Sequence, residues 1–202
     1  MSTLDDLINL QYEQIRHDEL AHTDILSLST KERVTHMTLH FAKYVGALFQ
    51  NIDDQRFQQV LIDALIIALA SANCLNVHLS ERIKEMKGVR SFDELTRAIS
   101  IDHHNVRDAL LRQLAIATGS MAKACEALDH QERGDWRARL EQEVTQIACI
   151  VFCAAHVLKL NFADQIRTRW RVVERRSIFY SLQNGDRDES KNLLVLMKSG
   201  SR

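Results

Sequence analysis

Apolar residues recur every three to four positions along most of this chain, which is the period of one face of an α-helix. The helix near residues 54–76 is almost wholly apolar after Val60, as expected of a helix that is buried on several sides. The pattern predicts helices near residues 4–22, 30–50, 54–76, 79–87, 104–127 and 135–158, and from 162 to about 175. The sequence therefore predicts an all-α fold.

Capping residues mark where these helices begin and end. A glycine, Gly88, closes the helix near 79–87, because glycine readily takes the left-handed conformation of a helix end. A hydroxyl residue stands three positions before an acid, the spacing of an N-terminal capping box, in three pairs: Thr3 and Asp6, Ser29 and Glu32, and Ser91 and Glu94. The first helix is expected to bury one apolar face, made of Leu4, Leu7, Ile8, Tyr12 and Ile15.

The chain also contains an internal repeat. Residues 60–83 resemble residues 143–166 at a constant offset of 83 positions, which places Gln146 on Asp63 and Ile166 on Ile83. We therefore expect a first helical module over 1–88, a second over 89–182 and a mobile polar tail over 183–202. The two modules are expected to pack as an internal pseudo-dimer through their apolar helices, burying Ile66, Ile67 and Leu69 against Ile147, Ile150 and Val151.

Composition narrows the class of protein. The chain has no proline and only 6 glycines, so it contains few helix breakers. The net charge of −1 argues against a generally basic nucleic-acid binder. The four cysteines lie in apolar stretches without zinc-type spacing, which indicates buried, reduced thiols. The N-terminus lacks an apolar signal core, and no apolar stretch is expected to reach the ~20 residues of a membrane span. We expect a cytoplasmic protein without a membrane partner.

Residues 29–48, the apolar helix after them and residues 76–83 carry a resemblance to a known family. Their order of long helix, glycine, apolar helix and short capped helix resembles the all-α nucleoside triphosphate pyrophosphatases, the MazG-like and dimeric dUTPase superfamily. The resemblance covers residues 28–87 and, more weakly, 104–176. His78 and Asn161 stand where family members have an aspartate that caps the last helix.

The resemblance implies a Mg²⁺ site that this chain has largely lost. Family members carry Glu-Glu-x-x-Glu on one helix and Glu-x-x-Asp on the next, and these carboxylates hold the ions. The matching positions are occupied here by Lys43, Tyr44, Ala47, Val60 and Asp63 in the first module and by Ile116, Ala117, Ser120, Glu143 and Gln146 in the second. Only Asp63 and Glu143 are acidic, so they are the residual catalytic candidates.

The leading hypothesis is thus a catalytically degenerate protein of this type that serves as a binding, regulatory or assembly module and needs no cofactor. The alternative is an active pyrophosphohydrolase that uses Mg²⁺ or Mn²⁺ and releases a nucleoside monophosphate and pyrophosphate. That enzyme would need acids outside the matching positions, such as Asp18, Glu19, Asp24 or Glu32.

Four residues on two helices, His36, His40, Lys43 and Asp63, are candidates for a binding site. Asp63 either forms an ion pair with Lys43, lies in a solvated groove or keeps some metal binding. His36 and His40 stand four positions apart on the face of Lys43, where they could bind a ligand. With Asp63 they could hold a transition metal, and the simpler alternative is two surface histidines.

A basic stretch near the C-terminus offers a second candidate. Arg167, Arg169 and Arg171, followed by two further arginines, could contact a nucleotide or other phosphate, bind a protein partner or simply form a solvated helix face. The apolar segment from Leu193 to Met197 could dock on a partner or fold back on the protein. A homodimer is a further expectation.

Overall fold

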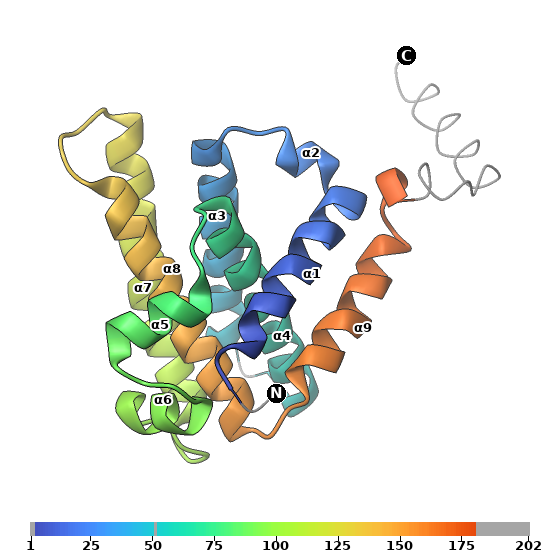
Figure 1. Ribbon diagram of the computed structural model, residues 1–202, viewed down its shortest axis with the longest axis vertical. Helices are drawn as coiled ribbons and strands as arrows, with labels where there is room; N and C mark the ends of the chain where they lie inside the picture. The colour runs from blue at the N-terminus through green and yellow to red at the C-terminus, as the bar shows by residue number, and fades with distance from the viewer. Residues whose placement is uncertain (1–2, 51, 181–202) are drawn as a thin grey trace.

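The computed structural model describes residues 3–50 and 52–180, and this part of the chain is all-α, as predicted (Figure 1). The helices within it are α1 (Asp6–Ala21), α2 (Thr23–Leu26), α3 (Thr30–Phe49), α4 (Asp54–Cys74), α5 (Leu79–Lys87), α6 (Phe92–Ile99), α7 (Val106–Asp129), α8 (Trp136–Val157) and α9 (Phe162–Glu174). The predicted tail over 183–202, with its segment Leu193 to Met197, lies outside the described residues.

Several of the expected helix caps are present. Ser29 and Glu32 form a complete capping box at the start of α3, with Glu32 N donating to Ser29 Oγ over 3.3 Å and Ser29 N donating to Glu32 Oε2 over 2.9 Å. Gly88 ends α5 with a φ of 66°, the left-handed conformation that glycine tolerates. The prediction of a hydroxyl cap at Thr3 is wrong, because α1 begins only at Asp6 and has no side-chain cap at its start. The Asp6 carboxylate instead accepts a hydrogen bond from the Thr3 amide.

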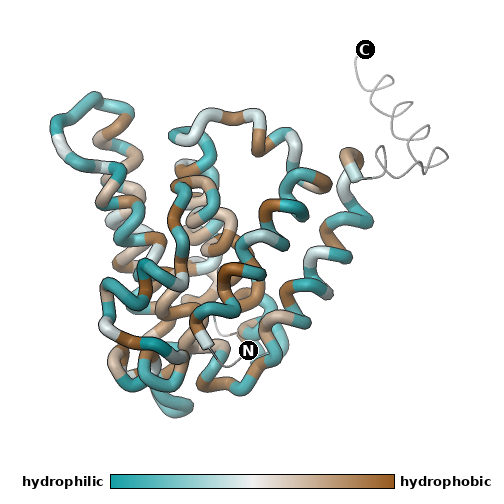
Figure 2. The backbone as a smooth tube through the Cα atoms, viewed as in Figure 1, coloured by the Kyte–Doolittle hydropathy of each residue, from teal (hydrophilic) through white to brown (hydrophobic). Residues whose placement is uncertain are grey.

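Two long helix pairs form the centre of the bundle. α3 packs on α4 and α7 packs on α8, and the pairs then join through α3 against α7 and α4 against α8. Side chains from all four helices belong to one continuous hydrophobic core that runs from Leu4 to Trp170. The loop between α7 and α8 is hydrophilic, whereas hydrophobic residues gather toward the middle of the bundle (Figure 2). Both halves of the chain therefore share one core.

The last helix crosses back onto the first half of the chain. The chain bends by 110° between α8 and α9, and α9 then packs on α1 and α4 (Figure 1). Trp170 lies buried in this contact and donates from Nε1 to Gln14 Oε1 over 3.1 Å. Ser177, just beyond α9, donates to the carbonyl of Ala21 over 2.7 Å. Side chains of α9 and of the residues just after it, Trp170 and Ser177, thus contact α1 directly.

The orientation of α1 matches the prediction only in part, because Leu4 and Leu7 are buried as expected and the other three residues are not. Ile8, Tyr12 and Ile15 are exposed, and the buried face carries polar residues such as Gln11 and Gln14 beside leucines. These amides are buried because they are hydrogen-bonded. The Gln11 side chain donates to the carbonyl of Val77 over 2.8 Å and accepts from the amide of Leu79 over 2.9 Å. Hydrogen bonds from Gln11, together with the buried leucines, therefore fix how α1 is turned.

One helix corrects the expectation about membrane spans. Among the described helices, α4 is long and apolar enough, by length and composition, to cross a membrane, with a mean hydropathy of 1.5. However, 61% of that apolar window is buried against the rest of the chain, as in a core helix. The bent pair of α8 and α9 passes the same test only if the two are taken together. Both observations are weak evidence for a membrane.

Candidate functional site

Asp63 does not pair with Lys43, as the sequence suggested, but with Arg169 from α9. The guanidinium donates from Nε to Asp63 Oδ1 over 2.7 Å and from Nη2 to Oδ2 over 3.2 Å. Both side chains are partly buried, with exposed fractions of 19% for Asp63 and 28% for Arg169. Because the arginine occupies both carboxylate oxygens, Asp63 is neutralised by a residue 106 positions away in the sequence.

Lys43 instead stays exposed and belongs to a chain of side chains along α3. Its Nζ lies 3.2 Å from Nδ1 of His40 and 4.9 Å from the ring centroid of Tyr44. Tyr44 is buried, and burial, followed by the negative charge of nearby Asp63, raises the pKa of its hydroxyl. The residues at the matching positions Tyr44 and Asp63 are therefore neighbours across α3 and α4.

Glu143, the other residual acid, is also engaged. Arg139 Nε lies 2.9 Å from Glu143 Oε1, and Ser120 Oγ on α7 donates to the same oxygen over 2.8 Å. Glu143 is buried at 7% exposure. At the neighbouring matching position, Gln146 donates to Gln113 over 2.9 Å. These polar groups join α7 to α8 and leave no group of carboxylates there.

Two arginines of α9 form ion pairs that attach this helix to α1 and α4. Arg167 forms a two-pronged pair with Glu13 of α1, from Nε over 2.7 Å and from Nη2 over 2.8 Å. That pair, with the bond to Asp164, raises the pKa of the Arg167 guanidinium. Arg169 holds Asp63, as described above. Of the three predicted ligand-binding arginines, Arg171 alone lies exposed without an ion pair to another described residue.

His36 and His40 do lie together, with their Nε2 atoms 3.1 Å apart. Since the Lys43 ammonium can only donate, it donates to Nδ1 of His40, which leaves Nε2–H of His40 to donate to His36. Burial, followed by the charges of Lys43 and the neighbouring histidines, lowers the pKa of His40 to about 4. Asp63 is held by Arg169, so it does not complete a metal site with this pair.

Both histidines line a cavity of about 90 Å³ between α1, α2, α3 and α4. We call this the histidine pocket. Its polar lining also includes Asp18, His22 and Arg33. Ile66 and Ile67, which were expected to pack against α8, are only half-buried and face this pocket instead. The expected partners on α8, among them Ile147 and Ile150, are fully buried in the core.

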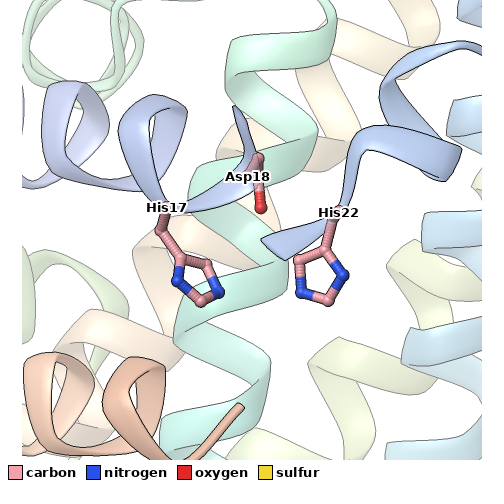
Figure 3. A group of neighbouring side chains, drawn as sticks. All are labelled: His17, Asp18 and His22. Atoms are coloured by element: carbon pink, nitrogen blue, oxygen red, sulfur yellow. The ribbon is translucent and has the colours of Figure 1, made fainter. Parts of the chain in front are cut away.

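A cluster that the sequence analysis did not bring together adjoins this pocket, and two of its members, Asp18 and His22, line it. His17, Asp18 and His22 each offer one ligand atom, and these three atoms all lie within 4.8 Å of one another. Figure 3 shows the two imidazole rings side by side with the carboxylate directed between them. This is the one group of at least three His, Cys, Asp or Glu ligands that converges within residues 3–50 and 52–180.

Burial shapes the electrostatics of this cluster. Burial lowers the pKa of His17, and the bond to Glu174 opposes this. Burial, and then the neighbouring His17, lowers the pKa of His22. Burial raises the pKa of the Asp18 carboxyl to about 7, while the bond from Gln14 and the charge of Arg33 act in the opposite direction. The cluster consequently favours neutral imidazoles, whose nitrogen lone pairs are free to bind a ligand.

The local signal for this cluster was weak for a physical reason. His17 and Asp18 occupy the last turns of α1, whereas His22 lies at a break between α1 and α2 with φ −134° and ψ 40°. The sequence pattern predicted one unbroken helix over 4–22, in which His22 would have lain away from His17. The break turns the His22 ring back toward α1.

The cysteines carry no comparable site. All four are free thiols, as expected, but only three are buried, because Cys74 is half-buried. Cys149 and Cys153 are fully buried in α8, and burial raises the pKa of each thiol to about 12. Because the thiolate is the reactive form, these residues serve core packing.

The fold thus defines an all-α bundle with a histidine pocket on one side. Comparison with family models, with curated proteins and with solved structures finds no match to this chain. The relation to the all-α pyrophosphatases accordingly remains a proposal that rests on the chain's own residues.

Proposed function

We propose that this chain is a catalytically degenerate protein of the all-α nucleoside triphosphate pyrophosphatase type, built from two related helical modules and acting as a binding, regulatory or assembly module. One observation carries the proposal. Each of the two acids left at the family's ligand positions is neutralised by an arginine, Asp63 by Arg169 and Glu143 by Arg139. Asp63 accepts from the guanidinium with both of its oxygens and Glu143 accepts with Oε1, and Mg²⁺ would need these oxygens as ligands.

The arrangement around these acids supports the relation to the family. The matching positions meet between paired helices in both halves, Tyr44 beside Asp63 in the first and Ser120 bonded to Glu143 in the second. The residues His78 and Asn161 occupy the N-cap positions of α5 and α9, as the resemblance implies.

The chemistry at these positions supports the loss of activity. Pyrophosphate release requires metal ions that offset the charge of the triphosphate and activate water. The matching positions of the first module now hold an exposed lysine, a buried tyrosine and an acid that is already paired. Because several carboxylates act as one unit, the loss of most of them removes nearly all catalysis.

The experiment is an assay of pyrophosphate release from a panel of nucleoside and deoxynucleoside triphosphates, with Mg²⁺ and with Mn²⁺, on the full chain. We expect no turnover above a metal-free blank in the wild type, in Asp63→Ala or in Glu143→Ala. Turnover that disappears in Asp63→Ala would overturn the proposal, because it would mean a working metal site around that acid.

A matched assay asks whether a nucleotide or phosphate still binds. Isothermal titration with a non-hydrolysable triphosphate is expected to give binding that weakens when the exposed Arg171 becomes methionine. The same change in an exposed lysine on α7, Lys123→Met, serves as the control. Binding that is equal in the wild type and in both variants would exclude α9 as a phosphate contact.

A further inference from the structure

The cluster of His17, Asp18 and His22 has the composition and convergence of a metal site. Imidazole nitrogens together with one carboxylate are ligands that suit Zn²⁺ and related ions, and catalytic zinc sites use three protein ligands with one open position. We propose that His17, Asp18 and His22 bind a first-row divalent transition metal ion, with Zn²⁺ as its natural probe. This site is separate from the positions that the pyrophosphatase resemblance assigns.

His17 is held in the orientation that a metal ligand needs. Its Nδ1 lies 3.0 Å from Glu174 Oε1 on α9, and its ring stacks on Trp170 with centroids 5.5 Å apart and planes inclined by 22°. Since Nδ1 is bonded to a carboxylate, Nε2 is the nitrogen left to bind the ion. A carboxylate behind a histidine ligand fixes its tautomer and raises its basicity, which is a common arrangement around bound metals.

Asp18 also has one oxygen free for the ion. Gln14 donates to Oδ1 over 2.8 Å, and this bond orients the carboxylate. Within the described part of the chain, Asp18 forms no salt bridge, although its side chain is largely buried. A buried carboxylate without a paired cation is unfavourable. A divalent ion would supply the missing positive charge.

His22 provides the adjustment that the geometry requires. Tetrahedral Zn²⁺ with bonds of about 2.0–2.1 Å separates two ligand atoms by about 3.4 Å, so atoms that now lie within 4.8 Å of one another must close by at most about 1.4 Å. His17 is fixed by α9, whereas His22 is half-buried at a non-helical corner, so we assign the adjustment to His22. The two rings already lie edge to face, with centroids 5.3 Å apart and planes inclined by 76°.

An independent observation indicates a ligand in the adjoining pocket. Arg33 lines the histidine pocket with Asp18 and His22, and its buried Nε has no hydrogen-bond partner in the described structure. A metal-bound water or an anion at the open coordination position would supply an acceptor on that side.

The test titrates the full-length chain, stripped of metal with a chelator, with Zn²⁺ alone by calorimetry and with Co²⁺ by visible absorption. We expect one equivalent of Zn²⁺ per chain and Co²⁺ bands typical of four or five ligands. His22→Gln and Asp18→Asn are each expected to weaken Zn²⁺ binding at least tenfold. Glu174→Gln, which touches only the back of His17, is expected to weaken binding about 10-fold.

Two sets of controls make the result specific. His103→Gln and His104→Gln change exposed loop histidines and are expected to leave Zn²⁺ affinity unchanged. The partly exposed His22 is the decisive variant, because a change at buried His17 could unfold α1, and circular dichroism verifies the fold of each variant. The proposal is overturned if the wild type binds no Zn²⁺, if His22→Gln binds it normally, or if only His36→Gln and His40→Gln lose it.

The metal site does not depend on the proposed loss of catalysis. Zn²⁺ binding is measured without nucleotide, and pyrophosphate release is measured on variants of Asp63 and Glu143, which contribute nothing to the cluster. A failed titration would therefore leave the conclusion about the pyrophosphatase positions intact. Equally, a positive pyrophosphate assay would leave the titration to decide whether His22 binds metal.

Discussion

The pair between Asp63 and Arg169 provides the sharpest energetic prediction. It joins α4 to α9 through two hydrogen bonds, of 2.7 Å and 3.2 Å. Because this pair neutralises Asp63, it decides whether the carboxylate is available to bind a metal ion. Asp63→Asn removes the charge with little change in volume. Arg169→Met keeps most of the length of the side chain and removes the guanidinium. Together with the double variant they form a complete cycle.

The burial of the two side chains sets the expected magnitude. Breaking a fully buried pair costs about 3–5 kcal/mol, whereas an exposed pair contributes about 0–1 kcal/mol. At exposures of 19% and 28% this pair lies between those limits. We expect Asp63→Asn to reduce the free energy of unfolding by about 2 kcal/mol, with a coupling energy of about 1–2 kcal/mol. Such a loss would lower Tm by about 4–8 °C in a chain of this size.

Urea unfolding, followed by far-ultraviolet circular dichroism and tryptophan fluorescence, measures these free energies. Arg171→Met is the matched control, because Arg171 lies exposed on the same helix and its replacement should change stability by less than about 0.5 kcal/mol. The reasoning is refuted if the coupling energy is below about 0.5 kcal/mol. Asp63 would then be free for other ligands, and the argument for a disabled metal site would lose its main support.

Three further predictions concern the fold. Gln11→Ala should destabilise the protein by about 2–4 kcal/mol in chemical unfolding, because it leaves an amide and a carbonyl beside α5 unpaired; a loss below about 1 kcal/mol would contradict this. Gly88→Ala should destabilise the protein by about 1 kcal/mol, because its φ of 66° disfavours a side chain. Gly46→Ala should stabilise it by up to about 1 kcal/mol, because Gly46 lies in the interior of α3 with open space around it. Equal effects of the two substitutions in thermal unfolding would be inconsistent with these conformations. Because the folded pKa of His40 is about 4 and its ordinary value is 6.5, its contribution is present above pH 6.5 and is lost as pH falls toward 4. Allowing for the partial exposure of His40, we expect the wild type to lose about 1–2 kcal/mol more of its free energy of unfolding over that pH range than His40→Gln loses. Curves of stability against pH that run parallel for the two proteins would exclude this contribution of His40.

Much of the fold could be predicted because the signals were local. Helical periodicity and caps such as Ser29 depend on residues within one or two turns, and the structure places most helix ends within a few residues of the predicted positions. The exposed and buried faces of α1 could not be predicted in the same way. Apolar counting favours Ile8 and Tyr12 as core residues, but the buried position goes to Gln11 because its partners on α4 and α5 satisfy its amide.

The candidate site was harder to predict because its contacts are distant in sequence. Lys43 was the nearest cation to Asp63 in the matching positions, whereas the actual partner, Arg169, reaches it only because the chain turns back after α8. The histidine cluster depends on a helix break at His22 that no proline or glycine announces. The pair His36 and His40 was found because spacing of four residues within one helix is a local pattern.

The two sites are linked by α9. Arg169 on this helix neutralises Asp63, and Glu174, one and a half turns further on, orients His17. Restoring glutamates at Lys43, Tyr44 and Ala47 would therefore not rebuild a Mg²⁺ site by itself, because the guanidinium of Arg169 would still hold Asp63 and repel the ion. Removing Arg169 to admit Mg²⁺ would in turn loosen the helix that positions His17. The placement of α9 thus disfavours the pyrophosphatase-type site and supports the histidine cluster at the same time.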